Sequence, residues 1–158
     1  MKSSFFKNLT IFLVLLLTVT LANSQEKNKG VEKVQDEMKV LQGNWICIKQ
    51  EANGELELNV KKMNKRLNFD KSVMIAEWVG GGGKTRTYTG KFELDSTTKP
   101  KKFDFLGKED PAGANLEWKG IYELTENEFK LMIVEKGLRP TEFKKTKGTY
   151  MQFKRDKD

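Results

Sequence analysis

The chain has 158 residues, a length typical of one domain, and its 29 Lys and Arg against 22 Asp and Glu give a formal net charge of +7. It contains no His, which excludes a histidine-based catalytic triad and a histidine-ligated metal site. Its single cysteine, Cys47, excludes a disulfide within one chain. We therefore expect a noncatalytic domain, without metal or cofactor, that is stabilised by its hydrophobic core.

Residues 1–24 have the pattern of an export signal. Lys2 and Lys7 give a positive start, an uncharged and mainly apolar run covers Leu9–Leu21, and Ala22-Asn23-Ser24 supplies small residues for cleavage. The run is shorter than the roughly 20 residues that a membrane-spanning helix needs. We predict a signal peptide and a periplasmic or secreted mature chain without a membrane span, in which 27 basic against 22 acidic residues leave a net charge of +5. An uncleaved membrane anchor is the alternative.

Residues 25–40 are expected to form a polar linker and a short helix. Four apolar residues follow one another at spacings of three, four and three, which places them on one helix face. They are Val31, Val34, Met38 and Leu41. Because this face is narrow and a domain begins directly after it, we expect the helix to cap the core of that domain. A partner-binding helix is the alternative.

From Gly43 onward, apolar and polar residues alternate with the period of β-strands, and turn residues separate eight such segments. No crossover helices are indicated between them. The pattern predicts an all-β fold, a small antiparallel up-and-down barrel over residues 41–156. The predicted strands are Asn44–Gln50, Arg66–Phe69, Ser72–Val79, Thr85–Leu94, Lys101–Leu106, Lys119–Leu124, Glu128–Glu135 and Thr149–Lys154.

The glycine run at 80–83 is predicted to form the tip of the hairpin between the third and fourth strands. The string Gly82-Gly83-Lys84-Thr85 matches the end of a phosphate-binding loop. However, Trp78 occupies the place of that motif's first glycine, and a strand pattern follows Lys84 where the motif needs a helix. The run therefore does not indicate nucleotide binding. A lid or a partner loop at the barrel mouth is its functional alternative.

An eight-stranded barrel is just wide enough to be filled by side chains or to hold one small ligand. Alternation places many large side chains on the predicted inner face, among them Tyr88, Phe92, Phe103, Phe105 and Phe129. Aromatic residues in strands belong to cores more often than to ligand sites, which favours a filled or nearly filled interior. A pocket would open if several of them faced outward.

The start of the first strand, Gly43-Asn44-Trp45, resembles the Gly-x-Trp motif of lipocalins. Further strings extend the likeness, namely Leu41-Gln42-Gly43-Asn44-Trp45, Lys99-Pro100-Lys101, Gly120-Ile121-Tyr122-Glu123-Leu124 and Arg139-Pro140-Thr141-Glu142-Phe143. Together they are similar to a family of uncharacterised exported lipocalin-like domains that is frequent in planctomycetes and related bacteria. The resemblance covers Leu41–Lys154. It implies a lipocalin-type barrel, and the family has no assigned activity to carry over.

In lipocalins, the tryptophan of this motif packs at the closed end of the barrel, often on an arginine near the last strand. The resemblance implies that Trp45 contacts either Arg139 or Arg155, and the sequence leaves both open. It also implies a ligand site inside the barrel. The candidate ligand-binding residues are Trp45, Tyr88, Phe92, Phe103, Phe105 and Tyr122. Since the strands are shorter than in lipocalins proper, a roomy ligand cup is not expected.

The string Arg139–Phe143 is expected to be structural. Pro140 fixes the backbone before the last strand, and Arg139 and Glu142 can bond to each other or to backbone groups. Phe143 is expected to seal the barrel end. The alternative is a recognition loop in which Arg139 and Glu142 are exposed.

The remaining reactive side chains are also expected to be structural. Cys47 lies in an apolar strand and is expected to be an inert packed thiol. The carboxylates of Asp104, Glu109 and Asp110 are assigned to turns and solvation. The doublets Lys61-Lys62, Lys101-Lys102 and Lys144-Lys145 are expected to be solvated, with an anionic envelope polymer as the alternative partner. Nucleic acid is not expected as a partner.

The sequence supports two classes of function. The first is a noncatalytic module, expected to be monomeric, that binds a small apolar or amphipathic ligand in the barrel. The second is an interaction or structural protein with a filled barrel, which presents its glycine tip, basic edge or helix to an envelope protein or an anionic polymer. An enzyme of unrecognised type ranks third because the chain lacks the commonest general base.

Overall fold

The computed structural model describes residues 32–144 and 148–157. Residues 32–41 form an N-terminal helix, and strands make up most of the chain after it. The further elements are β1 (Gly43–Ala52), β2 (Glu55–Leu56), α2 (Val60–Met63), β3 (Arg66–Asp70), β4 (Val73–Val79), the 3-10 turn η1 (Gly81–Gly83), β5 (Thr85–Asp95), β6 (Lys101–Asp110), β7 (Asn115–Leu124), β8 (Glu128–Val134) and β9 (Thr149–Arg155). The predicted signal peptide and linker lie outside the described residues. Within those residues, no helix has the length and apolar character needed to cross a membrane.

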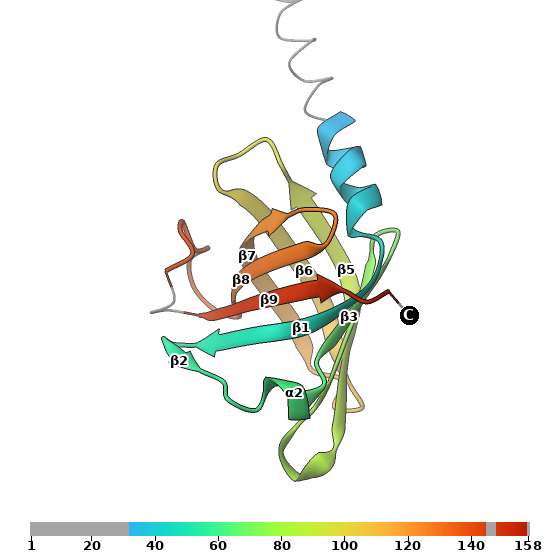
Figure 1. The fold of residues 1–158 in the computed structure, drawn as a ribbon, viewed down its shortest axis with the longest axis vertical. Helices are drawn as coiled ribbons and strands as arrows, with labels where there is room; N and C mark the ends of the chain where they lie inside the picture. The colour runs from blue at the N-terminus through green and yellow to red at the C-terminus, as the bar shows by residue number, and fades with distance from the viewer. Residues whose placement is uncertain (1–31, 145–147, 158) are drawn as a thin grey trace, which may run out of the picture.

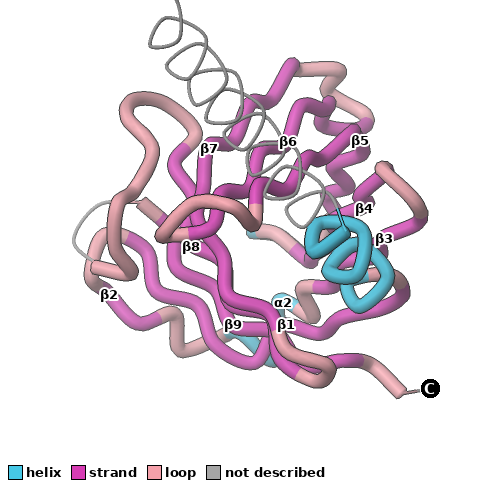
Figure 2. Tube along the Cα trace, turned by 90° about the horizontal axis from the view of Figure 1, so that it is seen from above, coloured by secondary structure: helices cyan, strands magenta, loops and turns pink. Residues whose placement is uncertain are grey.

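Eight strands close into an antiparallel barrel (Figure 1). From β3 to β9 each strand pairs with the next, β3 also pairs with β1, and β1 completes the ring by pairing with β9. Seen from above in Figure 2, the strands form a ring with the N-terminal helix at its edge. The two-residue β2 only extends the end of β1. The predicted up-and-down barrel is confirmed, and the glycine run lies at the tip of the β4–β5 hairpin.

The β6–β7 hairpin is longer than predicted. β6 continues past Leu106 to Asp110, and β7 begins at Asn115 rather than at Lys119. The segment 107–110 reads Gly-Lys-Glu-Asp and has no apolar alternation, so its strand conformation depends on pairing with β5 and β7 rather than on a local signal. β2 and α2 also lie where the sequence predicts no element.

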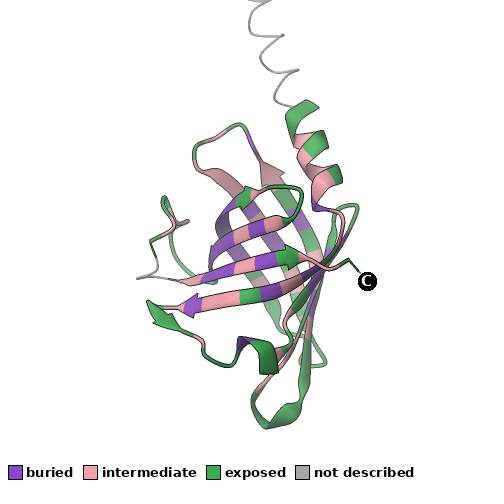
Figure 3. Ribbon diagram, viewed as in Figure 1, coloured by how far each residue is buried: buried purple, intermediate pink, exposed green. Residues whose placement is uncertain are grey.

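Buried and exposed residues alternate along the strands, as the banding in Figure 3 shows. In β8, Phe129, Leu131 and Ile133 enter the main core, while Met132 between them belongs to a separate cluster on the outer face. Side chains along β8 thus alternate between the inside and the outside of the barrel with a period of two, the pattern from which the sequence predicts inner and outer positions. The strand residues of the main core are Trp45, Cys47, Leu67, Phe69, Met74, Ala76, Tyr88, Phe92, Phe103, Phe105, Trp118, Tyr122, Phe129, Leu131, Ile133, Met151 and Phe153.

β5 and β6 approach each other closely at a pair of glycines. Gly90 lies directly opposite Gly107 in the ladder. A Cβ atom at Gly90 would lie 2.3 Å from the Leu106 carbonyl oxygen, far inside van der Waals contact. Glycine at this position therefore permits the close packing of two strands, a common device where barrel strands bend.

We expect Gly90→Ala to lower the free energy of unfolding by about 1–3 kcal/mol, because the β6 backbone must move to admit the methyl group. Equilibrium urea denaturation measures the change. Gly81→Ala at the hairpin tip is the matched control, since a Cβ atom there meets nothing within 4 Å. The control should change stability by less than about 0.5 kcal/mol. Equal effects of the two substitutions would contradict a packing role for Gly90.

The N-terminal helix caps one end of the barrel, which we call the closed end. Leu41 is fully buried and Met38 packs against the main core. Glu37 reaches the barrel rim, where it accepts a 2.5 Å hydrogen bond from the Tyr122 hydroxyl and forms a 2.7 Å ion pair with Lys101. Burial and the Glu37 carboxylate both raise the pKa of Tyr122, so its hydroxyl remains a donor at neutral pH. The capping role predicted for this helix is confirmed.

Trp45 and Arg155 complete the closed end. The guanidinium carbon of Arg155 lies 4.4 Å from the centroid of the Trp45 ring, within cation–π range. The same guanidinium donates to three backbone carbonyl oxygens, those of Val40, of Gln42 at 2.8 Å and of Glu126 at 2.8 Å. Arg155 is therefore the partner of Trp45 that the sequence left undecided. Gly43 has a φ of 95°, which accounts for glycine at the first position of the Gly-x-Trp string.

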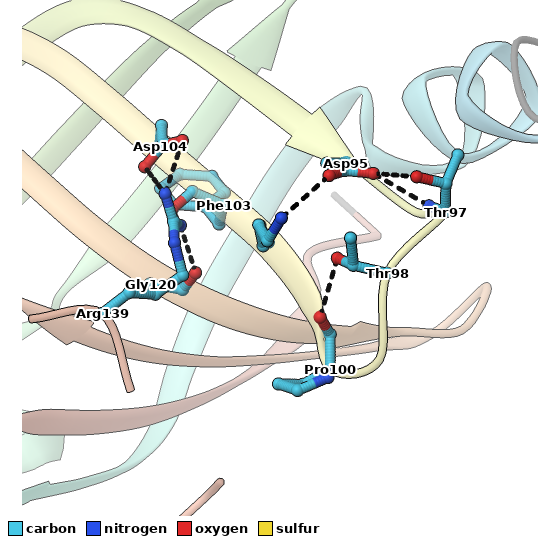
Figure 4. Close-up of polar contacts among 9 residues, drawn as sticks. Asp95, Thr97, Thr98, Pro100, Phe103, Asp104, Gly120 and Arg139 are labelled. Carbon is cyan, nitrogen blue, oxygen red and sulfur yellow. Dashed lines mark hydrogen bonds and ion pairs between the residues drawn. The ribbon is translucent and has the colours of Figure 1, made fainter. Parts of the chain in front are cut away.

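Arg139 belongs to a segment that we call the strap, residues 137–144, which lies against the outer face of the barrel. Its guanidinium donates to the carbonyl oxygens of Phe103 at 3.0 Å and Gly120 at 2.7 Å, and to both carboxylate oxygens of Asp104 at 2.6 and 2.8 Å (Figure 4). Phe103 and Gly120 face each other in the β6–β7 ladder. Arg139 therefore binds backbone carbonyl oxygens of β6 and β7, and its acidic partner is Asp104 rather than Glu142.

The prediction that Phe143 seals the barrel end is wrong. Phe143 packs on an outer-face cluster of Ile121, Met132 and Tyr150, and its ring meets that of Tyr150 edge-on at 6.2 Å. Ile121 and Met132 point outward because their neighbours in β7 and β8 point inward, and the strap covers these apolar side chains. Glu142 forms an exposed 3.4 Å ion pair with Lys144.

Candidate functional site

The closed half of the barrel is filled by aromatic rings. Phe129 lies at the centre of this group, which we call the aromatic plug. Its ring centroid is 5.8 to 6.3 Å from those of Trp45, Phe69, Phe103, Tyr122 and Phe153. Such distances are typical of packed aromatic pairs, so this half is occupied by the protein's own side chains.

The other half, away from the N-terminal helix, contains a cavity of about 200 Å³. Met63 of α2 lies in the wall of this cavity. The cavity is therefore at the end of the barrel where α2 lies, opposite the N-terminal helix in Figure 1. The wall is mainly apolar and aromatic, as is usual for ligand sites. The lining residues are Gln50, Met63, Lys65, Leu67, Ala76, Trp78, Tyr88, Trp118, Leu131, Ile133, Glu135, Thr149 and Met151.

Three aromatic residues form one side of the cavity. The rings of Trp78 and Tyr88 meet edge-on with centroids 4.3 Å apart, and Tyr88 meets Trp118 in the same way at 5.6 Å. Behind Trp118 lies Phe105, at 4.8 Å. The indole N–H of Trp118 is buried, and no acceptor for it exists among the described residues. A buried donor without an acceptor is uncommon in native proteins, and here its nitrogen is not accessible from the cavity.

Lys65 brings a positive charge to this apolar cavity. It stands between α2 and β3, and its ammonium group donates to the Gln50 side-chain oxygen at 2.7 Å and lies 4.9 Å from the centroid of the Trp78 ring. Within the described part of the chain it forms no ion pair. Burial lowers the pKa of Lys65, while the charges of Cys47, Glu135 and Glu57 oppose this shift.

We expect Lys65→Met to raise the free energy of unfolding at neutral pH, because it removes a cation whose burial disfavours the charged form. The folded-state pKa of Lys65 lies below its ordinary value of 10.5, so the unfolded chain binds the proton more tightly. Wild-type stability should therefore rise with pH in the window just below 10.5, and the variant should lose this component. Urea denaturation at a series of alkaline pH values measures both effects. Lys91→Met, on an exposed site of β5, is the control, and identical pH profiles of wild type and Lys65→Met would refute the argument.

The structure separates the six candidate ligand-binding residues. Tyr88 lines the cavity. Trp45, Phe92, Phe103 and Phe105 are buried in the main core and do not line it, and Tyr122 is engaged by Glu37 at the closed end. Lys65, Trp78 and Trp118 line the cavity but are not among the six. Trp78 lies in a predicted strand, Trp118 precedes the strand predicted at Lys119–Leu124, and nothing local distinguishes Lys65 from the other lysines.

A second depression, of about 440 Å³, lies outside the barrel between the helix and the β5–β6 loop. Most of its polar groups already have partners, and the one buried hydroxyl among its described residues without a partner, that of Ser96, is inaccessible. Thr97 bonds to Asp95, Thr98 donates to the Pro100 carbonyl oxygen (Figure 4), and Lys101 and Tyr122 hold Glu37. The cavity inside the barrel beside Lys65 is therefore the better candidate site.

Among the side chains weighed for catalysis, the thiol is buried and two of the three carboxylates have structural partners. Cys47 is buried, and burial raises the pKa of its thiol, which disfavours the nucleophilic thiolate. Asp104 holds Arg139, and Glu109 pairs with Arg86 at 3.4 Å. Among the described residues there is no group of His, Cys, Asp and Glu side chains that could hold a metal ion.

Comparison of the chain with protein-family models, with curated proteins and with solved structures finds no match. The resemblance to exported lipocalin-like domains stays a prediction.

Proposed function

We propose that this protein is an exported, noncatalytic barrel that binds a small apolar or amphipathic molecule in the cavity at its open end. The observation that carries this proposal is the uneven filling of the barrel. Aromatic rings fill the closed half, whereas the open half keeps an apolar space of about 200 Å³ walled by Trp78, Tyr88 and Trp118. Export rests on the signal-like pattern of residues 1–24.

The cavity volume limits the size of the ligand. An apolar cavity of about 150 Å³ is large enough to bind benzene. The present cavity, at about 200 Å³, therefore suits one ring with a short substituent, or a short acyl chain. Long lipids would have to leave most of their length outside the barrel.

Two measurements test the proposal. Native mass spectrometry of gently purified protein, compared with a denatured and refolded sample, shows whether a small molecule is carried. Toluene titration followed by NMR shows whether the cavity accepts an apolar guest. Ala76→Leu should abolish toluene binding because Ala76 is buried in the cavity wall, whereas Ala114→Leu, in the exposed β6–β7 loop, should not. Absence of both a carried mass and toluene binding would refute the proposal.

The second candidate function, interaction with an envelope protein, is favoured by an exposed apolar patch near α2. Ile48, Leu56 and Leu58 are exposed there, Leu58 at 85%, and the doublet Lys61-Lys62 flanks them in an open groove. Exposed leucines beside lysines match an acidic partner with apolar side chains. If the cavity takes up no guest, this patch becomes the leading candidate, and Leu58→Ser should weaken the interaction.

A further inference from the structure

We propose that the ligand of the cavity is an acid, a small molecule with a compact apolar body and a carboxylate that binds the ammonium group of Lys65. This inference rests on the proposed function and goes beyond it, because it assigns the charge and the polarity of the ligand. It is carried by two groups in the cavity wall, the Lys65 ammonium, whose acceptors the protein does not fully provide, and the aromatic side chains beside it.

Lys65 is the first of these groups. An ammonium group has three donor hydrogens and accepts none. Gln50 takes one of them at 2.7 Å, and the only other polar contact of the group within the described residues is the weak acceptor Sδ of Met151 at 3.7 Å. A partly buried cation is strongly favoured when an anion neutralises it, and the described residues supply no carboxylate in ion-pair contact. A ligand carboxylate would complete this environment.

The aromatic side chains of the wall are the second group. Trp78, Tyr88 and Trp118 line the same cavity, and their rings give it an apolar surface. The indole nitrogen of Trp118 is itself inaccessible, so it does not serve as a donor to a ligand. One ammonium group in a mainly apolar, aromatic cavity selects a ligand with an apolar body and acceptor oxygens, and an anionic ligand more than a neutral one.

The cavity also contains one acidic residue, Glu135. It is exposed, and it forms no ion pair with Lys65. A carboxylate at this position repels an acidic ligand, so its removal should strengthen binding of the acid. This gives the test a second arm with an effect of opposite sign.

Three probes of the same shape separate charge from size, namely phenylacetate, phenylacetamide and phenethylamine. Each has one ring and a short substituent, as the cavity volume requires. Isothermal titration calorimetry at neutral pH should show phenylacetate binding at least about tenfold more tightly than phenylacetamide, a ratio expected for a charge-assisted hydrogen bond. Phenethylamine should bind most weakly of the three.

Variants then assign the preference to Lys65. Lys65→Met should remove the difference between acid and amide while leaving phenylacetamide binding within about threefold of wild type. Lys91→Met, the exposed control on β5, should keep the wild-type ratio. Glu135→Gln should raise the affinity for phenylacetate by a few-fold, about what loss of a nearby like charge gives at a solvated rim.

The outcomes are distinguishable. If wild type binds phenylacetamide as tightly as phenylacetate, the acidic ligand is refuted while the binding function stands. If Lys65→Met lowers the affinity for both probes equally, Lys65 only supports the cavity wall, and the inference fails. If none of the probes nor toluene binds to a protein with a folded circular dichroism spectrum, the proposed binding function itself fails.

Discussion

Phe129→Ala is expected to lower the free energy of unfolding by about 3–5 kcal/mol, the largest effect of any single substitution considered for this chain. Phe129 is fully buried, and five aromatic rings of the plug lie within 6.3 Å of its own ring. Truncation removes the apolar surface of the ring and leaves a void. The surrounding side chains are fixed on several different strands, so they cannot move in to fill it. Since domains of this size are stable by only about 5–15 kcal/mol, the midpoint of urea denaturation should fall strongly.

Two further variants make this result specific to the plug. Phe143→Ala is the same chemical change in the strap on the outer face, where the side chain is partly exposed, and it should cost only about 1 kcal/mol. Phe129→Leu keeps much of the buried volume and should cost about 1–2 kcal/mol. It should also leave toluene binding at the open end intact. A loss in Phe129→Ala no larger than in Phe143→Ala would show that the plug is not the centre of stability.

The fold could be predicted because its signals are local. Phe129, Leu131 and Ile133 alternate with outward residues, and this period of two alone assigns their inner face. The glycine run at 80–83 likewise marks the β4–β5 turn without reference to any distant residue. Where the alternation stops, as in segment 107–110, the sequence does not predict the strand because only its partners hold it in place.

The candidate site could not be predicted in the same way, because its residues come together only through strand register. The partners of Lys65 are Gln50, 15 residues away, and Met151, 86 residues away. Whether Lys65 reaches the cavity or solvent depends on how β1 pairs with β3 and β9, and no local pattern records this. The position of Phe143 could not be predicted for the same reason. From sequence alone, an apolar residue near the last strand can seal a barrel end or join a cluster on the outer face, and Phe143 does the latter.

The choice between Arg139 and Arg155 as the partner of Trp45 also depended on register. Both arginines lie near the last strand in the sequence, yet Arg155 sits directly opposite Trp45 in the β1–β9 ladder. Arg139 precedes that strand and crosses instead to Asp104 on β6. The pairing thus results from the closure of the barrel, which places the last strand, β9, beside β1.

Arg155→Met is expected to lower the free energy of unfolding by about 2–4 kcal/mol. The substitution keeps an apolar stem over Trp45 but leaves the carbonyl oxygens of Val40, Gln42 and Glu126 without their charged donor. Val40 lies in the last turn of the N-terminal helix, where a cation also stabilises the helix dipole. Urea denaturation measures the loss of stability, and amide hydrogen exchange over residues 32–41 should become faster as the helix detaches more often.

Lys154→Met and Arg155→Lys are the comparisons that assign this loss to the guanidinium group. Lys154 is exposed on the same strand, so its replacement should change stability by less than about 0.5 kcal/mol. Lysine at 155 keeps the charge but lacks the planar fork that serves several acceptors at once, so it should recover only part of the loss. Full recovery by lysine would mean that charge alone holds the closed end. Unchanged exchange over residues 32–41 in Arg155→Met would mean that the helix is held by Leu41 and Glu37 without help from β9.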